Sequence, residues 1–94
     1  MAIRFEWDAS KAKKNLRKHK VSFEEAKTIF NDPFTVTYPD PEHSDNEERD
    51  ITIGISARAR LLLVVHTDEE GRVRIISCRK ATLAERRFYE QGEE

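Results

Sequence analysis

The sequence lacks the features of secreted, disulfide-stabilised and membrane-spanning proteins. Cys78 is the only cysteine among the 94 residues, so no disulfide can form within the chain. The longest apolar run, Leu61 to Val65, is far shorter than the ~20 residues that a helix needs to cross a bilayer. Residues 1–4 also lack the apolar stretch of a signal peptide. These absences predict a cytoplasmic protein with no membrane partner.

The chain also lacks the motifs of most enzymes that use a cofactor, a metal ion or an acyl-enzyme. It has no GxGxxG or Walker loop, no HExxH, no paired cysteines and no serine in a nucleophile elbow. His19, His43 and His66 are scattered without the spacing of metal ligands, and Cys78 falls inside an expected strand. We therefore predict no cofactor and no metal site.

Apolar residues are scarce and charged residues are abundant. The apolar share of 37% is below the ~45% of typical globular domains, and the charged share of 37% is above the usual ~25%. A chain of 94 residues has room for one hydrophobic core. The sequence therefore predicts a single domain over residues 1–94, with a small core and a highly charged surface.

The formal net charge of -1 averages over charge blocks that can lie on different faces of the molecule. Acids dominate residues 40–50 and the end of the chain, whereas two basic blocks could form one basic face. The first block comprises Lys11, Lys13, Lys14, Arg17, Lys18 and Lys20, and the second comprises Arg72, Arg74, Arg79, Lys80, Arg86 and Arg87. The alternative for the first block is a solvated helix face, but the presence of a second block favours binding of backbone phosphates by both.

The first third of the chain predicts a strand followed by two helices. Residues 3–7 alternate between apolar and charged side chains, as in a strand with one buried face. Asp8 is a suitable N-cap for a first helix. The apolar side of that helix comprises Ala9, Ala12, Leu16 and His19. Ser22 and Glu25 form a capping box for a second helix, which ends at residues 31–33.

The rest of the chain predicts four strands and a last helix. We expect strands at residues 34–38, 51–55, 61–65 and 73–78, with a mobile acidic loop over 40–48 and a turn at 68–71. Thr82 and Glu85 form a second capping box, and Gly92 suits the end of the last helix.

The expected fold class is therefore α+β: an N-terminal strand, two helices, a four-stranded antiparallel meander and a C-terminal helix. A mixed sheet, in which the first strand lies beside a later one, stays open at this point.

The side chains that are left for chemistry are basic groups and a few proton-transfer groups, and such a set can cleave RNA. The 2′-hydroxyl of the substrate attacks the adjacent phosphorus once a base removes its proton. An arginine or lysine stabilises the charge on the phosphate, and an acid protonates the departing 5′-oxygen. This reaction needs no cofactor.

His19 is the first catalytic candidate, because histidine titrates near neutrality and Lys18 and Lys20 on either side would attract an anionic substrate. The alternative is a buried histidine that ends the helix and bonds a carbonyl group.

Arg79 and Lys80 are the second pair of catalytic candidates, since they precede a capped helix whose free amides can help to bind an anion. A structural ion pair of Arg79 with Glu48 or Glu85 is the alternative.

Glu48 is the last catalytic candidate, as a carboxylate base at the start of a strand; its alternative is a solvated side chain. Tyr89 could stack on a base, although filling the edge of the core is the more common role of tyrosine. The residues expected to bind RNA are Lys14, Lys18, Arg49, Arg74, Glu85, Arg86 and Tyr89.

These segments resemble the BrnT family of toxins over nearly the whole chain. The similarity lies in FEWDASKAKKNLRKHKVSFEEA, EHSDNEERDITIG, LLLVVHTDEEGRVRIISCRKAT and ERRFYE, in that order. The family usually has Pro at the position of Ala9, Gly at that of Lys20 and Ala at that of Cys78. None of these three departures removes a group expected to do chemistry.

The resemblance implies a fold similar to RelE-type ribonuclease toxins and cleavage of RNA that arrests translation. It also implies neutralisation by a DNA-binding antitoxin of the BrnA type, through which alone the toxin would reach operator DNA. The family motifs fall on the following residues: Lys18, His19, Glu47, Glu48, Arg49, Arg79, Lys80, Glu85, Arg86 and Tyr89.

Two other functions compete with a ribonuclease. The basic face could dock nucleic acid or a protein and break no bond, in which case growth would stop while cellular RNA stays intact. The chain could also serve mainly to complete a DNA-binding complex with its antitoxin, in which case it would be harmless when expressed alone.

Overall fold

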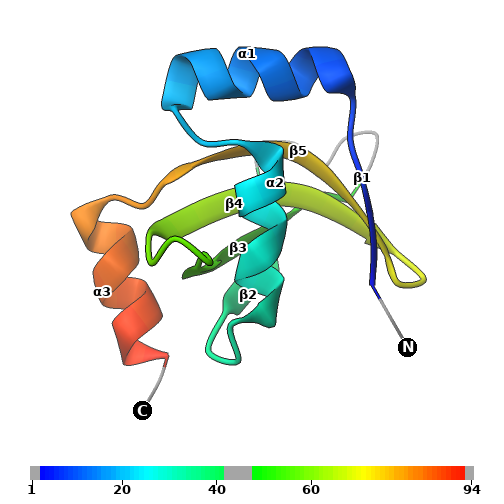
Figure 1. Cartoon of the computed structure of the whole chain (residues 1–94). Coiled ribbons are helices and arrows are strands. Elements are labelled where there is room, and N and C mark those ends of the chain that lie inside the picture. Colours follow the sequence, from blue (N-terminus) through cyan, green and yellow to red (C-terminus); the bar gives the residue numbers. More distant parts are fainter. Residues whose placement is uncertain (1–2, 42–47, 93–94) are drawn as a thin grey trace.

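Five strands and three α-helices make up the described parts of the chain, residues 3–41 and 48–92 of a computed structural model (Figure 1). In chain order the elements are β1 (Arg4–Glu6), α1 (Ala9–His19), α2 (Phe23–Lys27), the 3₁₀ helix η1 (Thr28–Asn31), β2 (Val36–Pro39), β3 (Asp50–Ile55), β4 (Leu61–Glu69), β5 (Arg72–Lys80) and α3 (Leu83–Gln91). The α+β class expected from the sequence is confirmed.

The strands form one mixed sheet in the order β1-β5-β4-β3-β2. From β2 to β5, each strand pairs antiparallel with the next strand along the chain, as expected for a meander. β1 adds a fifth strand, which pairs parallel with β5. The prediction of a four-stranded antiparallel sheet is therefore corrected to a five-stranded mixed sheet. The pairing of β1 covers only Arg72 to Arg74 of β5, and no local turn joins the two strands, so sequence periodicity carries no signal for it.

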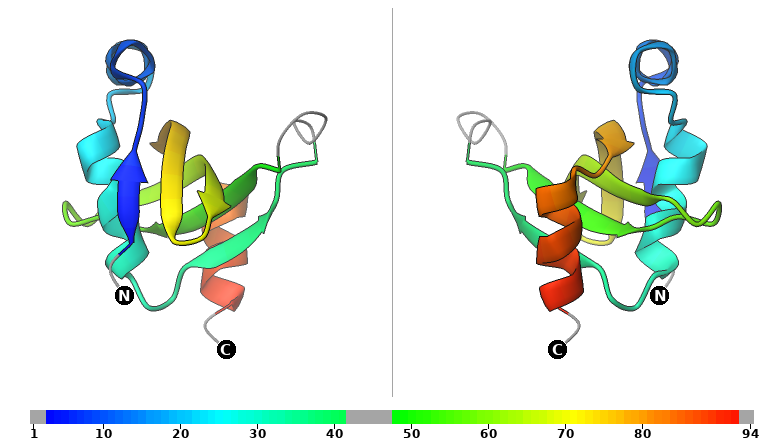
Figure 2. Two further views of the ribbon diagram at one scale, coloured as in Figure 1. Left: turned by 90° about the vertical axis from the view of Figure 1, so that its right-hand side faces the viewer. Right: turned by 90° about the vertical axis from the view of Figure 1, so that its left-hand side faces the viewer.

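The two faces of the sheet carry separate apolar clusters. On one side, here called the helix face, α1 and α2 lie over the sheet (Figure 2). The cluster there comprises Val21, Phe23, Ala26, Ile29, Leu62, Val64, Val73, Ile75 and Cys78. On the other side, here called the α3 face, the cluster comprises Ile53, Leu61, Leu63 and Tyr89, with Val36, Tyr38, Ile51, Val65 and Ala81 packed against it.

A β-bulge in β5 decides which of its side chains reach the α3 face. Val65 pairs with Ser77, but the next residue, His66, pairs with Ile75, so one extra residue is inserted in β5. The insertion reverses the alternation of side chains along the strand. Ile75 and Cys78 therefore both lie in the helix-face cluster, and Arg79 lies on the α3 face.

Helix α1 begins as expected and buries a different side chain from the expected one. The Asp8 side chain accepts a hydrogen bond from the Lys11 amide at 3.0 Å, which confirms the N-cap. The prediction that Leu16 lies on the buried side is wrong, because Leu16 is 50% exposed and Asn15 is 7% exposed. The helix ends at Lys20, which adopts the left-handed conformation with φ 61°.

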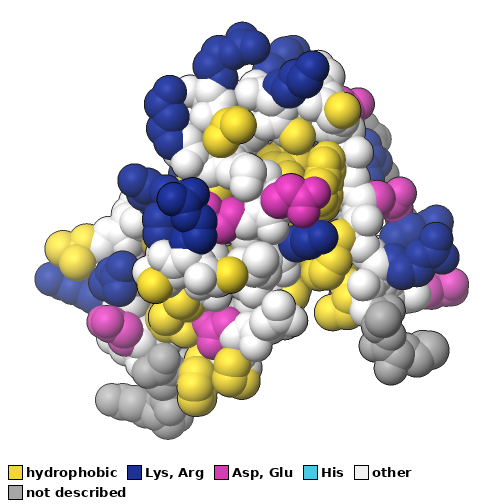
Figure 3. Space-filling view, viewed as in Figure 1, with side chains coloured by type: hydrophobic (Ala, Val, Ile, Leu, Met, Phe, Trp, Pro, Cys, Tyr) yellow, Lys and Arg dark blue, Asp and Glu magenta, His cyan; other side chains and the backbone are white. Residues whose placement is uncertain are grey.

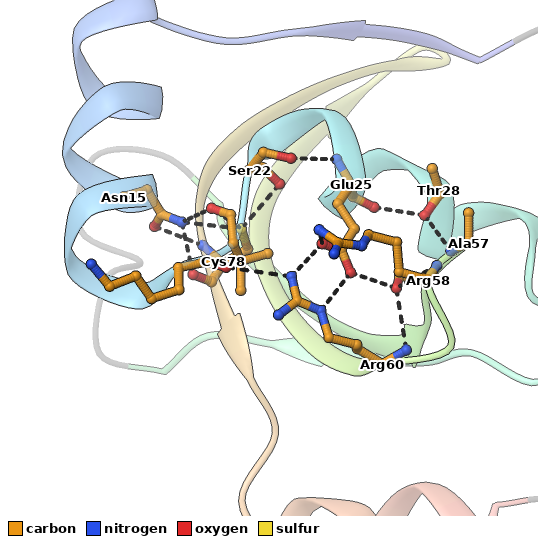
Figure 4. A network of polar contacts seen from close by, with 11 residues as sticks. Asn15, Ser22, Glu25, Thr28, Ala57, Arg58, Arg60 and Cys78 are labelled. Carbon is orange, nitrogen blue, oxygen red and sulfur yellow. Dashed lines mark hydrogen bonds and ion pairs between the residues drawn. The ribbon is translucent and has the colours of Figure 1, made fainter.

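At the N-terminus of α2, only one of the two hydrogen bonds of the predicted capping box forms, and the helix is hydrogen-bonded to the β3–β4 turn. The Ser22 side chain accepts from the Glu25 amide at 3.0 Å. The Glu25 carboxylate does not complete the predicted capping box; it accepts from Ser56 Oγ at 2.7 Å and from Arg60 Nε at 2.9 Å (Figure 4). A buried carboxylate needs such partners, and a cation provides more compensation than the Ser22 amide would.

The remaining boundaries differ in detail from those expected. β2 starts at Val36, because the Asp32 side chain accepts from the Phe34 amide at 2.9 Å and holds Phe34 in a turn. Of the expected acidic loop, residues 42–47 lie outside the described residues, Asp40 is buried and Glu48 is exposed. α3 has the predicted Thr82–Glu85 capping box and ends at Gly92.

The left-handed conformation of Lys20 predicts a stabilising substitution. Lys20→Gly removes the clash of Cβ with the following carbonyl, which costs about 1–2 kcal/mol, against a smaller entropic cost of glycine. We expect the free energy of unfolding in urea to rise by about 0.5–1 kcal/mol. Lys13→Gly, in the exposed middle of the same helix, is the matched control and should lower it by about 1 kcal/mol. A loss of stability in both variants would contradict the account.

The Glu25 contacts predict a specific loss of stability in acid. The hydrogen bond from Arg60 lowers the pKa of Glu25 below its usual 4.5, so the stabilisation is present above that pH and is lost as the pH falls through the lower, folded-state pKa. Glu25→Gln should lower the free energy of unfolding by about 2–3 kcal/mol at pH 7. The difference from the parent chain should shrink towards pH 3. Urea unfolding at the two pH values measures it, and an unchanged difference would refute it.

Candidate active site

A hollow of about 290 Å³ on the α3 face brings together the last residue of α1, the end of β5 and the start of α3. We call it the β5 hollow. Its lining comprises His19, Tyr38, Asp40, Ile51, Leu63, Val65, Ser77, Cys78, Arg79 and Glu85. The lining combines apolar side chains from β3 and β4 with polar and charged groups from the other elements. It can therefore accept a molecule that is apolar on one side and anionic on another.

Arg79 is held in place by Glu85 at one end of this hollow. Arg79 Nη1 donates to Glu85 Oε1 at 2.8 Å and Nη2 donates to Oε2 at 2.9 Å, a two-pronged ion pair. These hydrogen bonds lower the pKa of Glu85 and raise that of Arg79. Glu85 also accepts from the Thr82 amide at 2.8 Å, so the cap of α3 fixes the carboxylate that orients Arg79.

The ion pair leaves Arg79 able to bind an anion. Besides Glu85, the guanidinium donates to the Lys80 carbonyl at 3.2 Å through Nη1. A guanidinium has further N–H groups that these three bonds do not use. The structural ion pair that the sequence left as an alternative is present, and it is compatible with a phosphate beside Arg79.

Asn15 connects the end of α1 to β5 next to Arg79. Because β1 pairs with β5 only as far as Arg74, Cys78 lies on a part of the strand edge that β1 does not cover. The Asn15 side chain takes the place of a neighbouring strand: Nδ2 donates to the Cys78 carbonyl at 2.9 Å, and the Cys78 amide donates to Oδ1 at 3.1 Å (Figure 4). Nδ2 also donates to the Val21 carbonyl at 3.0 Å.

This contact accounts for the meeting of His19 and Arg79 at the hollow. His19 is four residues after Asn15 on α1 and therefore on the same side of the helix. Arg79 follows Cys78 directly and points to the opposite face of the strand. The buried side-chain amide of Asn15 therefore positions both candidate groups of the site, His19 and Arg79.

Three polar residues of the hollow were not expected from the sequence: Tyr38, Asp40 and Ser77. Burial, and then the charge of Glu85, raise the pKa of Tyr38, so its hydroxyl keeps its proton at neutral pH. The alternation in residues 34–38 places Tyr38 on the side of Val36, which was a usable signal. The bulge in β5 hid Ser77, since simple alternation from Val73 puts Ser77 on the wrong face.

Other candidates lie outside the hollow. Glu48, Lys80, Arg74 and Arg86 are exposed, and Arg49 is half-buried with its carbonyl accepting from the Asp40 amide at 2.9 Å. Arg74 lies near the other end of β5, opposite Glu6 of β1. The hollow therefore brings together His19, Arg79 and Glu85 of the residues predicted for catalysis or RNA binding.

Tyr89 does not present a surface for stacking. It is 3% exposed, packs in the α3-face cluster and donates its hydroxyl to Asp32 Oδ2 at 2.6 Å. Burial raises the pKa of Asp32, but the hydrogen bonds from Tyr89, Ile55 and Phe34 together lower it below its usual value. Tyr89 therefore fills the edge of the core, which is the alternative that the sequence left open for it.

The lysines of α1 form a strongly basic surface. Lys14 and Lys18 are exposed, and Lys and Arg side chains gather over α1 at the top of the space-filling view (Figure 3). This surface adjoins the C-terminal end of α1, where His19 reaches the hollow. It can attract an anionic polymer towards that end.

His66 and Cys78, which the sequence analysis discounted as metal ligands, are buried. Burial lowers the pKa of His66, whose Nε2 lies 2.7 Å from Thr52 Oγ1. Burial raises the pKa of the Cys78 thiol to about 12, so the thiol is inert at neutral pH. Within residues 3–41 and 48–92, no group of three or more His, Cys, Asp or Glu side chains is placed to hold a metal ion.

The family of the chain is shown by its match to a family profile. The profile of the family described as "Ribonuclease toxin, BrnT, of type II toxin-antitoxin system" matches residues 7–85. The chain belongs to the BrnT family of ribonuclease toxins. All residues that line the hollow, from His19 to Glu85, fall within the range matched by the BrnT profile. No curated protein matches the chain.

A solved BrnT structure has the same fold. The 1.1 Å crystal structure of the Brucella abortus ribonuclease toxin BrnT matches with a TM-score of 0.62 and 20% sequence identity, over 86% of this chain and 99% of that chain. At this identity the likeness supports the fold alone. Membership of the BrnT family makes RNA the substrate and a protein antitoxin the partner. Within the described residues, no helix is long and apolar enough to span a membrane.

The buried amide of Asn15 predicts a large loss of stability on truncation. Asn15→Ala in this BrnT chain leaves the Cys78 amide and carbonyl and the Val21 carbonyl without that partner. We expect the free energy of unfolding in urea to fall by about 3 kcal/mol. Asn31→Ala, an exposed asparagine of η1, is the matched control and should change it by less than about 0.5 kcal/mol. Equal effects of the two substitutions would show that the Asn15 hydrogen bonds to Cys78 and Val21 contribute nothing to stability.

Proposed function

We propose that this toxin is a metal-independent endoribonuclease and that the β5 hollow is its active site. The observation that carries the proposal is the convergence of His19 and Arg79, from opposite ends of the chain, on one hollow. Attack by a 2′-hydroxyl on phosphorus requires a proton-transfer group and a cation, and these two residues line the same hollow.

In this mechanism His19 removes the proton of the 2′-hydroxyl. The 2′-oxygen bonds to phosphorus, and Arg79 donates hydrogen bonds to the phosphate oxygens on which charge gathers. The bond from phosphorus to the 5′-oxygen then breaks, and in this proposal the Tyr38 hydroxyl gives that oxygen a proton. The products are a 2′,3′-cyclic phosphate and a 5′-hydroxyl end. Glu85 keeps Arg79 in position.

The exposed basic residues are proposed to bind the rest of the RNA strand. Lys14 and Lys18 on α1, Arg74 on β5 and Arg86 on α3 would contact backbone phosphates, with Arg49 beside Asp40 at the edge of the hollow. The exposed side chain of Lys80, next to Arg79 in sequence, would contact the incoming strand. Glu48, also exposed, is given no such contact, because its carboxylate would repel the phosphates. Such contacts give affinity and carry little sequence preference.

The partner is proposed to be a DNA-binding antitoxin of the BrnA type, which would carry the toxin to operator DNA. We place the action in the cytoplasm, where cleavage of RNA would arrest translation. The support for this is the family membership together with the resemblance in motifs.

The second candidate function is a co-repressor that binds nucleic acid or its antitoxin without cleavage. The observation that favours it is the ion pair of Arg79 with Glu85, which balances the charge of the candidate catalytic cation. A binding module needs no free charge at this position.

Substitution of Arg79 separates the two functions. Arg79→Ala should lower the rate of cleavage of a bacterial RNA about 10²- to 10³-fold, the usual cost of losing one donor to a transition-state oxyanion. Arg58→Ala, on the β3–β4 turn with its side chain 74% exposed, is the control and should cleave normally. Both proteins are checked for folding by circular dichroism, and cleavage is measured in excess chelator.

The outcome that would end the ribonuclease proposal is a folded parent protein that binds RNA and leaves it intact. Cleavage that needs a divalent ion, or that is unchanged in Arg79→Ala, would reject the mechanism.

A further inference from the structure

The lining of the β5 hollow holds more apolar surface than binding of a phosphate needs. Ile51, Leu63 and Val65 form its apolar part, and a charged phosphate group gains nothing from such side chains. A nucleobase does gain, because its flat faces are poorly hydrated and bind to aromatic and apolar surfaces.

An aromatic pair continues this apolar surface towards solvent. The rings of Tyr38 and Phe88 meet edge to face, with centroids 5.6 Å apart and an interplanar angle of 88°. Phe88 is 49% exposed, although it lies on α3 directly before the buried Tyr89. An exposed aromatic side chain at the edge of a polar hollow is a common feature of sites that bind single-stranded nucleic acid.

The pair lies close to the groups that would hold the phosphate. The charges of Glu85 and Arg79 both act on the Tyr38 hydroxyl, and Phe88 is three residues after Glu85 on α3, on the same side of the helix. The apolar surface and the cation are therefore neighbours, as the base and the phosphate of one nucleotide are.

We propose that Tyr38, Phe88 and the apolar lining of the β5 hollow bind one unpaired nucleobase, next to the phosphate held by Arg79. This inference rests on the proposed ribonuclease function and adds the substrate class: single-stranded RNA with one base turned into the hollow. A base within a duplex has its faces covered by its neighbours and cannot enter.

The test measures binding, so that it does not depend on cleavage. Single-stranded 2′-O-methyl RNA has no free 2′-hydroxyl and cannot be cleaved by the proposed route. A series of such oligonucleotides, each with the base removed at one position, is titrated with the protein by fluorescence anisotropy. We expect Kd to rise about 10- to 100-fold when one particular base is missing, as for loss of one stacked base, and to change little at the others.

Variants then identify the residues that bind this base. Phe88→Ala should raise Kd for the intact oligonucleotide by a similar factor, and the further effect of removing the base should disappear. Phe34→Ala, which removes an aromatic side chain that is 54% exposed and outside the hollow, is the matched control and should leave both the affinity and the effect of base removal unchanged.

Two results would overturn the proposal. One is equal binding of every oligonucleotide in the series. The other is a base effect that persists in full in Phe88→Ala, and loss of antitoxin binding in that variant would then assign Phe88 to the protein interface. Failure of the ribonuclease function is a different result: unmodified RNA is bound with the predicted base effect but is not cleaved.

Discussion

The side-chain amide of Asn15 is the contact on which the candidate site depends. It replaces a missing strand at the edge of β5 by pairing with both the amide and the carbonyl of Cys78. An amide buried at this position is costly unless its donors and acceptor are satisfied, and the Val21 carbonyl takes up a further hydrogen bond. The bonds therefore fix α1 against β5 at the point where His19 and Arg79 meet.

A second constraint works through the alternation of side chains. The extra residue of the bulge lets the first half of β5 serve the helix-face core and lets Ser77 and Arg79 serve the hollow on the other face. The Glu85 carboxylate then fixes the guanidinium, and it is itself fixed by the cap of α3. Sheet geometry, a helix cap and one ion pair thus act on the same side chain.

Local patterns in the sequence were sufficient to predict most elements and to single out His19, Arg79 and Glu85. The alternating strands, the Asp8 and Thr82 caps and the order of elements follow from interactions between residues close in sequence. The errors concern contacts between distant segments. Leu16 has the apolar character of a core residue, yet the geometry of the β5 edge demands the amide of Asn15 in the interior.

The same reason explains the fifth strand, the role of Glu25 and the missed residues of the hollow. β1 pairs with a strand at the other end of the chain, and Glu25 meets Arg60 from the β3–β4 turn. Ser77 could not be placed without the bulge, which has no reliable sequence signal. Tyr89 was predicted from its motif to be a contact residue, but its hydroxyl donates to the Asp32 carboxylate and its ring packs in the α3-face cluster. The sequence therefore identified candidate residues of the site, but it did not show on which side of the sheet Ser77 lies or that Tyr89 is buried.

The central claim is that RNA binds in the β5 hollow, and NMR spectroscopy tests it most directly. Amide shifts of the isotopically labelled protein are followed during titration with a non-cleavable 2′-O-methyl dinucleotide. We expect the largest changes on the residues at the end of α1, at Ser77 to Arg79 and at Tyr38. Changes confined to the outer lysines of α1, or to the surface around Phe34 and Ile55, would contradict it.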